Sequence, residues 1–119
     1  MKPPPPVAAV KPAEAPVRPK VEHYPPKVAA AGKPLLLAIR VYPAQQVTAI
    51  RLHYRRLNHL AKFETLETTP ARGTFTIPGE HISAASDLMY YFEVLNTAKG
   101  GWFHPDPRTA TPYFVVKVE

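Results

Sequence analysis

The chain has 119 residues, which is room for one domain of ordinary size, and it contains no cysteine, which excludes a disulfide framework and a thiolate metal site. Lys and Arg together number 15 against 9 Asp and Glu, but the net charge of +6 is spread along the chain and never forms the dense basic block that favours nucleic acid. The apolar runs are too short to span a bilayer, and the start of the chain runs directly into proline, so we expect neither a transmembrane segment nor a signal peptide in this numbering.

The N-terminal stretch is predicted to be an extended arm over residues 1–20. Nine of the sixteen prolines fall within residues 1–26, and such spacing disfavours helix and favours polyproline II. The alternation of Lys or Arg with Pro and Ala resembles the periplasm-spanning segments of bacterial energy-transducing proteins. Two interpretations stay open here: a plain linker, or an arm that tethers the domain to another chain.

The remainder, residues 21–119, alternates apolar and polar residues in short runs separated by Gly, Pro and Asn. Seven such runs at spacings near ten residues, without a convincing helix, predict an all-β antiparallel sandwich. A corner-like turn is expected just before the sixth run. The expected strands cover residues 21–28, 35–41, 47–56, 63–67, 74–77, 88–96 and 111–118.

The sixth run, Leu88 to Asn96, is predicted to be the central strand, because it is an unbroken series of aromatic and branched residues. Counting by twos, Tyr90 belongs to an inner face and Tyr91 to an outer face. The residues expected to point inward and form the core are Leu37, Ile39, Ile50, Leu52, Tyr54, Phe75, Tyr90, Phe92, Val94, Phe114 and Val116.

Several segments, in order, resemble bacterial immunoglobulin-like or fibronectin type III-like modules. They are Val21-Glu22-His23, Gly32-Lys33-Pro34-Leu35, Arg51-Leu52-His53-Tyr54-Arg55, Ile77-Pro78 and Tyr90-Tyr91-Phe92-Glu93. The resemblance implies an immunoglobulin-like sandwich over residues 21–119, of the kind found as accessory domains in surface, periplasmic and polysaccharide-processing proteins. It also implies that Tyr90 is a corner tyrosine whose hydroxyl bonds to upstream backbone. The family carries no catalytic residues, and the insertion at residues 102–107 departs from its pattern.

Catalytic and metal-binding signals are sparse. Asp occurs only at positions 87 and 106, and neither a Gly-x-Ser-x-Gly motif nor a glycine-rich phosphate loop is present. The five histidines lack metal-ligand spacing, although His53 and His59 flank a predicted turn and could meet. We therefore expect no enzyme activity, no cofactor and no metal, with the histidines on the surface.

One face of the predicted sheet has the composition of a protein interface. If the strand at 47–56 lies beside the central strand, its basic row borders outward tyrosines and aliphatic residues of the last two strands. The alternative is an ordinary solvated face in which Arg stems cover stray apolar groups. The expected partner-binding residues are Arg51, Arg55, Tyr91, Leu95, Trp102, Phe103, Tyr113 and Val115.

Trp102 and Phe103 are expected on a hairpin loop held stiff by Pro105 and Pro107. Such a loop could stack on a sugar, fill a partner's pocket, or fold back over the end of the core. The function we predict is a non-catalytic structural or accessory subunit that docks on a larger bacterial assembly through its arm and one sheet face. A carbohydrate- or ligand-binding module is the alternative. We expect protein partners, not nucleic acid, at the periplasm or cell surface, with the cytoplasm left open.

Overall fold

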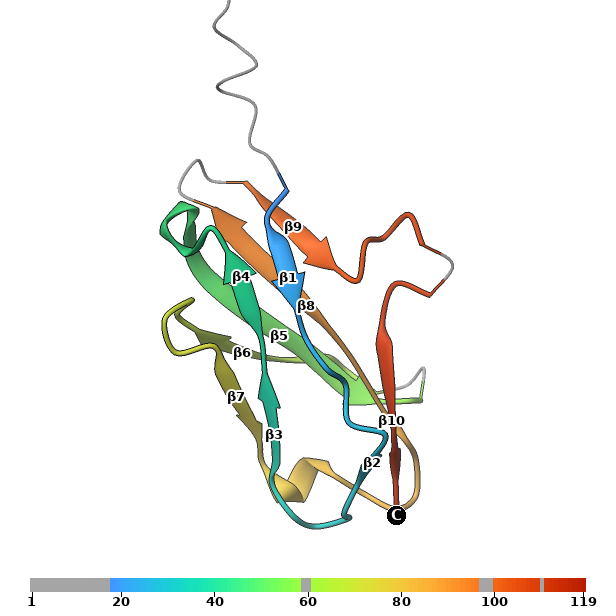
Figure 1. The fold of residues 1–119 in the computed structure, drawn as a ribbon. Coiled ribbons are helices and arrows are strands. Elements are labelled where there is room, and N and C mark those ends of the chain that lie inside the picture. The colour runs from blue at the N-terminus through green and yellow to red at the C-terminus, as the bar shows by residue number, and fades with distance from the viewer. Residues whose placement is uncertain (1–17, 59–60, 97–99, 110) are drawn as a thin grey trace, which may run out of the picture.

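The computed structural model describes residues 18–58, 61–96, 100–109 and 111–119. Within these ranges ten short strands form mostly antiparallel sheets and no α-helix occurs, which confirms the all-β prediction (Figure 1). It follows that the described part contains no helix long and apolar enough to cross a membrane. The strands are β1 Lys20–Glu22, β2 Val28–Ala29, β3 Leu35–Ala38, β4 Arg40–Tyr42, β5 Val47–Arg56, β6 Glu64–Thr68, β7 Thr74–Ile77, β8 Leu88–Asn96, β9 Gly101–His104 and β10 Phe114–Val118; η1 Ala44–Gln46 and η2 Gly79–His81 are 3₁₀ turns.

Strand β8 is the centre of the largest sheet, whose order is β2-β10-β8-β5-β6. Strand β5 pairs with β8 along nearly its whole length, while the other edge of β8 is shared by two strands. Its first residues pair with β10 and its later residues, Phe92 to Leu95, pair with β9. Strand β2 runs parallel to β10 and closes that edge of the sheet. The long apolar run in the sequence is therefore the strand around which this layer assembles.

Strand β9 corrects the prediction that Trp102 and Phe103 lie on a hairpin loop. Because β10 covers only the beginning of β8, backbone groups farther along β8 need another partner, and Gly101–His104 supplies it. Gly101 suits the position, since a Cβ there would lie 2.7 Å from the Val94 carbonyl oxygen. The loop expected to start at residue 102 begins only after His104.

A second layer contains β1 paired with β4, and β3 paired with β7. The single strand predicted at residues 35–41 changes partner at Ile39, whose N–H donates to the Gly73 carbonyl over 2.8 Å. Gly73 has φ +61°, and a Cβ there would lie 2.4 Å from the Ile39 oxygen, so a side chain would prevent this contact. The predicted strand at residues 21–28 is likewise divided, into β1 and β2.

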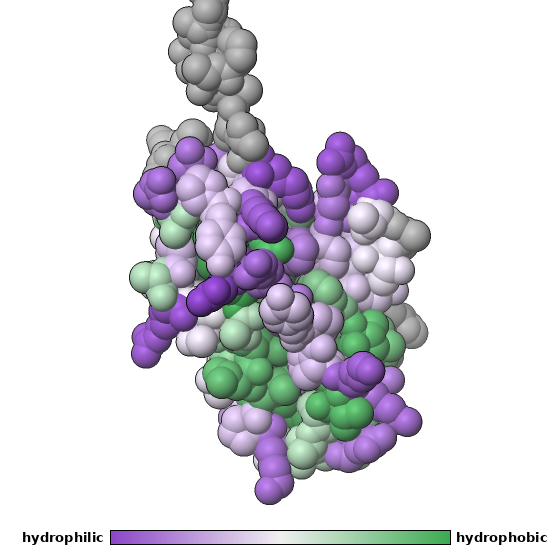
Figure 2. Space-filling view, in the orientation of Figure 1, coloured by the Kyte–Doolittle hydropathy of each residue, from purple (hydrophilic) through white to green (hydrophobic). Residues whose placement is uncertain are grey.

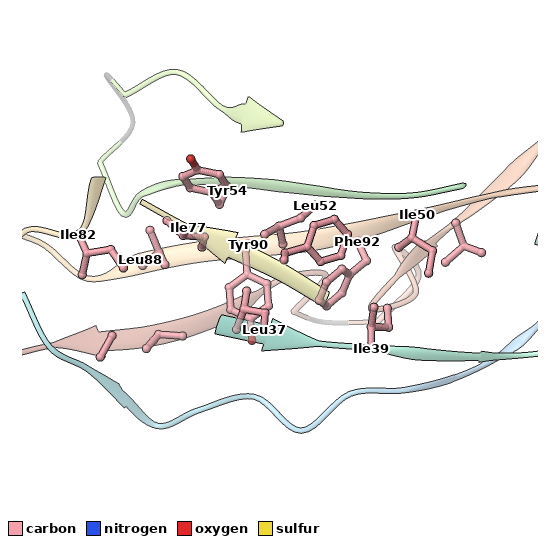
Figure 3. Close-up of a cluster of buried hydrophobic side chains, with 14 of the residues drawn as sticks. Leu37, Ile39, Ile50, Leu52, Tyr54, Ile77, Ile82, Leu88, Tyr90 and Phe92 are labelled. Carbon is pink, nitrogen blue, oxygen red and sulfur yellow. The ribbon is translucent and has the colours of Figure 1, made fainter. Parts of the chain in front are cut away.

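The apolar core lies between the two layers, where side chains of β5 and β8 point toward Leu37 and Ile39 of the other layer (Figure 3). Alternation along the strands was predicted correctly: Leu37 is 1% exposed whereas its neighbour Leu36 is 64% exposed. Of the eleven residues expected to point inward, ten are buried and Phe114 is partly buried against them. Ile77 and Leu88 also belong to the core and were not predicted.

The hydroxyl of Tyr90 does not bond to upstream backbone, as the family resemblance implied, but to a side chain. It lies 2.6 Å from His23 Nε2, while His23 Nδ1 lies 2.7 Å from the Ala38 carbonyl oxygen. Because a carbonyl only accepts, Nδ1 carries the proton and Nε2 accepts from the tyrosine hydroxyl. The His23 ring also packs edge-on against Phe92 and Phe114, and burial lowers its pKa. His23 is thus a bridge between the layers rather than the surface residue expected.

Candidate functional site

The outward face of β5 and β8 places the predicted basic row beside the predicted aromatic row. Arg51 stands opposite Glu93, and His53 stands opposite Tyr91. Arg55 stands opposite Met89 one step further along. The adjacency on which the interface prediction depended is confirmed, and it divides this face into a polar half and an aromatic half.

The polar half is already neutralised within the chain. Arg51 Nε donates to Glu67 Oε1 at 2.9 Å, and His53 Nε2 lies 2.9 Å from Glu93 Oε1. The second ring nitrogen of His53 lies 3.0 Å from the Thr65 hydroxyl. Since these groups satisfy one another, a partner that covers them gains little from charge pairing, and this half is suited to the rim of an interface.

Tyr91 is the centre of the aromatic half. Its ring stacks on His53 with centroids 4.9 Å apart and meets the edges of Phe63 at 5.5 Å and Phe103 at 5.8 Å. The Arg55 guanidinium lies over the Phe63 ring at 4.5 Å, a cation–π contact. Burial, aided by the negative charge of Glu93, raises the pKa of the Tyr91 hydroxyl, so this group remains a neutral hydrogen-bonding group at ordinary pH.

These rings form one wall of a groove of about 330 Å³, which we call the aromatic–proline groove. It exists because β9 ends at His104, opposite Phe92, and β10 begins at Phe114, opposite Tyr90. Beside Tyr91, the segment that connects β9 to β10 therefore leaves the sheet after His104 and rejoins it at Phe114. The residues that line the groove are Phe63, Met89, Tyr91, Phe103, Pro105, Pro107, Pro112 and Tyr113.

Only part of the predicted partner-binding set lies in the groove. Three residues, Tyr91, Phe103 and Tyr113, line it, and Arg55 supports its Phe63 wall. Val115 is 43% exposed on β10, opposite the groove residue Met89. Arg51 and Leu95 lie farther along β5 and β8, outside the groove.

Trp102 and Phe103 project from opposite faces of β9. Trp102 pairs with the buried Val94 and packs against the core, whereas Phe103 pairs with Glu93 and is 43% exposed. The two rings therefore cannot form a single flat platform for a sugar. Beside them Asp106 and Arg108 form an ion pair of 2.7 Å, which lowers the pKa of Asp106.

Several groove residues were missed from the sequence. Phe63 could have been found, since it directly precedes β6 and shares the parity of the outward residues Thr65 and Glu67 on that strand, and Met89 shares the parity of Tyr91. Pro105, Pro107 and Pro112 carried no such signal because they lie outside any ladder.

A polar depression of about 260 Å³ beside the C-terminal end of β5 contains a hydrogen bond between a tyrosine and a histidine. The Tyr54 hydroxyl lies 2.6 Å from His81 Nδ1, and burial raises the pKa of Tyr54, so the hydroxyl stays protonated near neutral pH. Across the described ranges, no three His, Asp or Glu side chains gather as a metal site. His59 lies outside those ranges, so its predicted meeting with His53 is not placed.

Hydrophobic side chains are also exposed outside the groove. Leu36 on β3 of the other layer is 64% exposed, and Val28 on β2, at the edge of the β8 sheet, is 49% exposed. Figure 2 shows apolar residues gathered over the lower part of the domain in this view, where β2 and β3 lie, whereas hydrophilic side chains cover the upper part around β1. This surface is the natural comparison for the groove in any binding experiment.

No protein-family model matches this chain, and a search of curated proteins finds no similar sequence.

Proposed function

We propose that this protein is a non-catalytic structural or accessory module that docks on a larger bacterial protein assembly through the outward face of β5, β8, β9 and β10. The observation that carries the proposal is the aromatic–proline groove, in which Phe103 is 43% exposed beside Tyr91. Contiguous exposed aromatic side chains on a soluble domain mark an interaction surface. The periplasm or cell surface is the compartment that we propose from the composition of the arm.

The topology supports an immunoglobulin-like sandwich as the finer description of the fold. Such sandwiches place the third, sixth and seventh strands in one sheet and the first, second and fifth in the other. Here β5, β8 and β10 share one layer, and β4 with β1 and β3 with β7 form the other. The parallel pairing of β2 with β10 joins the first segment of the chain to the last strand.

Protein interfaces concentrate binding energy in central aromatic anchors surrounded by a polar rim. Tyr91, Phe103 and Tyr113 suit the anchor role because they line an apolar depression. Arg51 suits the rim because its guanidinium is exposed and paired with Glu67. This division predicts that truncating an anchor abolishes docking, whereas truncating Arg51 alters mainly its salt dependence.

Site-specific crosslinking in the native cells tests the proposal. A photoreactive phenylalanine analogue at position 103 is expected to give a discrete adduct with a partner protein, because this ring lies at the mouth of the groove. The same analogue at position 36 is the matched control, since Leu36 is more exposed but lies on the other layer. The adduct from position 103 is expected to disappear when Tyr113 is replaced by Ser.

Equal crosslinking from positions 103 and 36, or none from either, would contradict the proposed docking face. Specific binding of the purified monomer on a glycan array, lost in the Trp102→Ala variant, would favour the carbohydrate alternative instead.

A further inference from the structure

The aromatic–proline groove and the N-terminal arm have complementary chemistry. We propose that the arm of the same chain occupies the groove, with the Pro3–Pro6 segment seated against the aromatic wall, and that a partner protein displaces it. The arm thereby regulates the docking face, so this inference rests on the proposed function for the displacement step. Residues 1–17, which lie outside the described ranges, contain six prolines and only one acidic residue, Glu14.

The groove has the features that a polyproline II ligand requires. Such a helix has no internal hydrogen bonds and packs its rings into aromatic-lined grooves, where its preformed shape keeps the entropic cost low. The lining consists of four aromatic rings, three prolines and a methionine. A β-strand ligand would need an open ladder edge, but the groove wall of prolines lacks donors for such pairing. Four consecutive prolines are the segment of this chain that best fits the site.

The point where the arm enters the domain lies beside the groove. Arg18, the first described residue, donates through Nη2 to the Phe103 carbonyl oxygen. Arg18 also lines a depression of about 400 Å³ together with Phe103 and Pro107, which are both groove residues. Pro19 is buried, so the start of the described chain is held against the domain. The arm is therefore anchored at one end of its proposed site.

The arm is long enough to reach across the groove. Eleven residues, 7–17, separate Pro6 from Arg18. At about 3.1 Å per residue they span up to about 34 Å in polyproline II form. This span exceeds the linear dimensions of a groove whose volume is about 330 Å³.

Tethering favours the arm of the same chain over that of a second copy. A short linker gives an effective concentration on the order of millimolar, so even a weak contact is well populated within one molecule. An intermolecular complex of the same strength would need a comparable protein concentration. At micromolar concentrations the arm is therefore expected to cover the aromatic wall of its own domain.

Paramagnetic relaxation measurements on the full chain test this directly. The chain contains no cysteine, so Ala8→Cys gives one attachment site for a nitroxide label next to the proline segment. The backbone amide signals of Tyr91, Phe103 and Tyr113 are expected to lose most of their intensity. Those of Leu36 and Thr76, on the other layer, are expected to remain nearly unchanged.

Two variants sharpen the measurement. Phe103→Ser is expected to restore the intensity of the Tyr113 signal, whereas Leu36→Ser is expected to leave the broadening intact. Replacing Pro4 and Pro5 together by Gly is expected to restore the groove signals, because glycine loses the preformed polyproline II shape.

The proposal is overturned if broadening is absent, is equal on both layers, or is concentrated around Leu36. It is also overturned if the broadening occurs only between molecules. A mixture of nitroxide-labelled chains without isotopes and isotope-enriched chains without nitroxide would then show the broadening, which would assign the groove to the arm of a second copy. The measurement uses the purified chain alone, so its failure is distinct from failure of the crosslinking test at position 103.

Discussion

The two sides of β8 make different use of very similar residues. On the inner side Phe92 and Val94 are 0% exposed, because the β3 and β7 layer encloses them. On the outer side Tyr91 and Leu95 are only partly covered, and Tyr91 has mainly other rings of the same face as its neighbours. Aromatic composition alone does not decide whether a strand face belongs to the core or to the exposed surface. The presence of a second layer does.

The largest expected effect is on the inner side. Phe92→Ala should reduce the free energy of unfolding by about 3–5 kcal/mol, because it leaves a cavity in a fully enclosed core. This loss is comparable to the whole stability of many small domains. The measurement is urea denaturation followed by circular dichroism.

Phe103→Ala on the outward face is the matched control for Phe92→Ala and should leave the unfolding midpoint close to that of the parent. If the two variants lost similar stability, the distinction between an enclosed side and an open side of the sheet would be wrong.

A smaller effect is expected from the bridge that joins the layers. Tyr90→Phe removes the hydroxyl that donates to His23 Nε2 and leaves that nitrogen without its tyrosine donor. We expect a loss of about 1–3 kcal/mol, the usual cost of a buried polar group that loses its hydrogen bond. Thermal unfolding can measure it, with the outer-side substitution Tyr91→Phe as control. A neutral result for Tyr90→Phe would show that water or another donor replaces the hydroxyl.

The smallest effect follows from pH. Burial lowers the pKa of His23 below its ordinary 6.5, and burial together with the charges of Arg18 and His23 lowers that of His104. The unfolded chain therefore binds more protons than the folded chain below about pH 6.5, so stability is fully present above that pH and falls as the pH drops. Denaturation at pH 7.5 and 5.5 should show this difference, and His23→Gln should reduce it. An unchanged dependence in His23→Gln would assign the effect to other groups.

Period-two alternation was enough to predict much of this fold. Leu36 and Leu37 were assigned to opposite faces correctly, and the bounds of β5, β7 and β8 were predicted from runs of apolar residues. Alternation says nothing about which backbone groups lack a partner, so β9 was taken for a loop. It also did not reveal that the strand through Ile39 changes partner, because that change depends on a contact with Gly73, distant in sequence.

The candidate site was less predictable than the core for a related reason. The neighbours of Tyr91 on β5 follow from strand order, and these were anticipated. The groove itself depends on where β9 ends and β10 begins, which is set by hydrogen bonding to β8. Pro107 and Pro112 reach the site from outside any ladder, so no periodic pattern could assign them.

The divided edge of β8 has a consequence for how this surface could diversify. Since β9 and β10 are each held by their own ladder, the segment between His104 and Phe114 is fixed at both ends by bonds that do not involve its own side chains. Insertions or substitutions in that segment would reshape one groove wall without altering strand register. The domain is thus organised as a frame of paired strands that presents an exchangeable loop between β9 and β10, which makes this loop a suitable graft site.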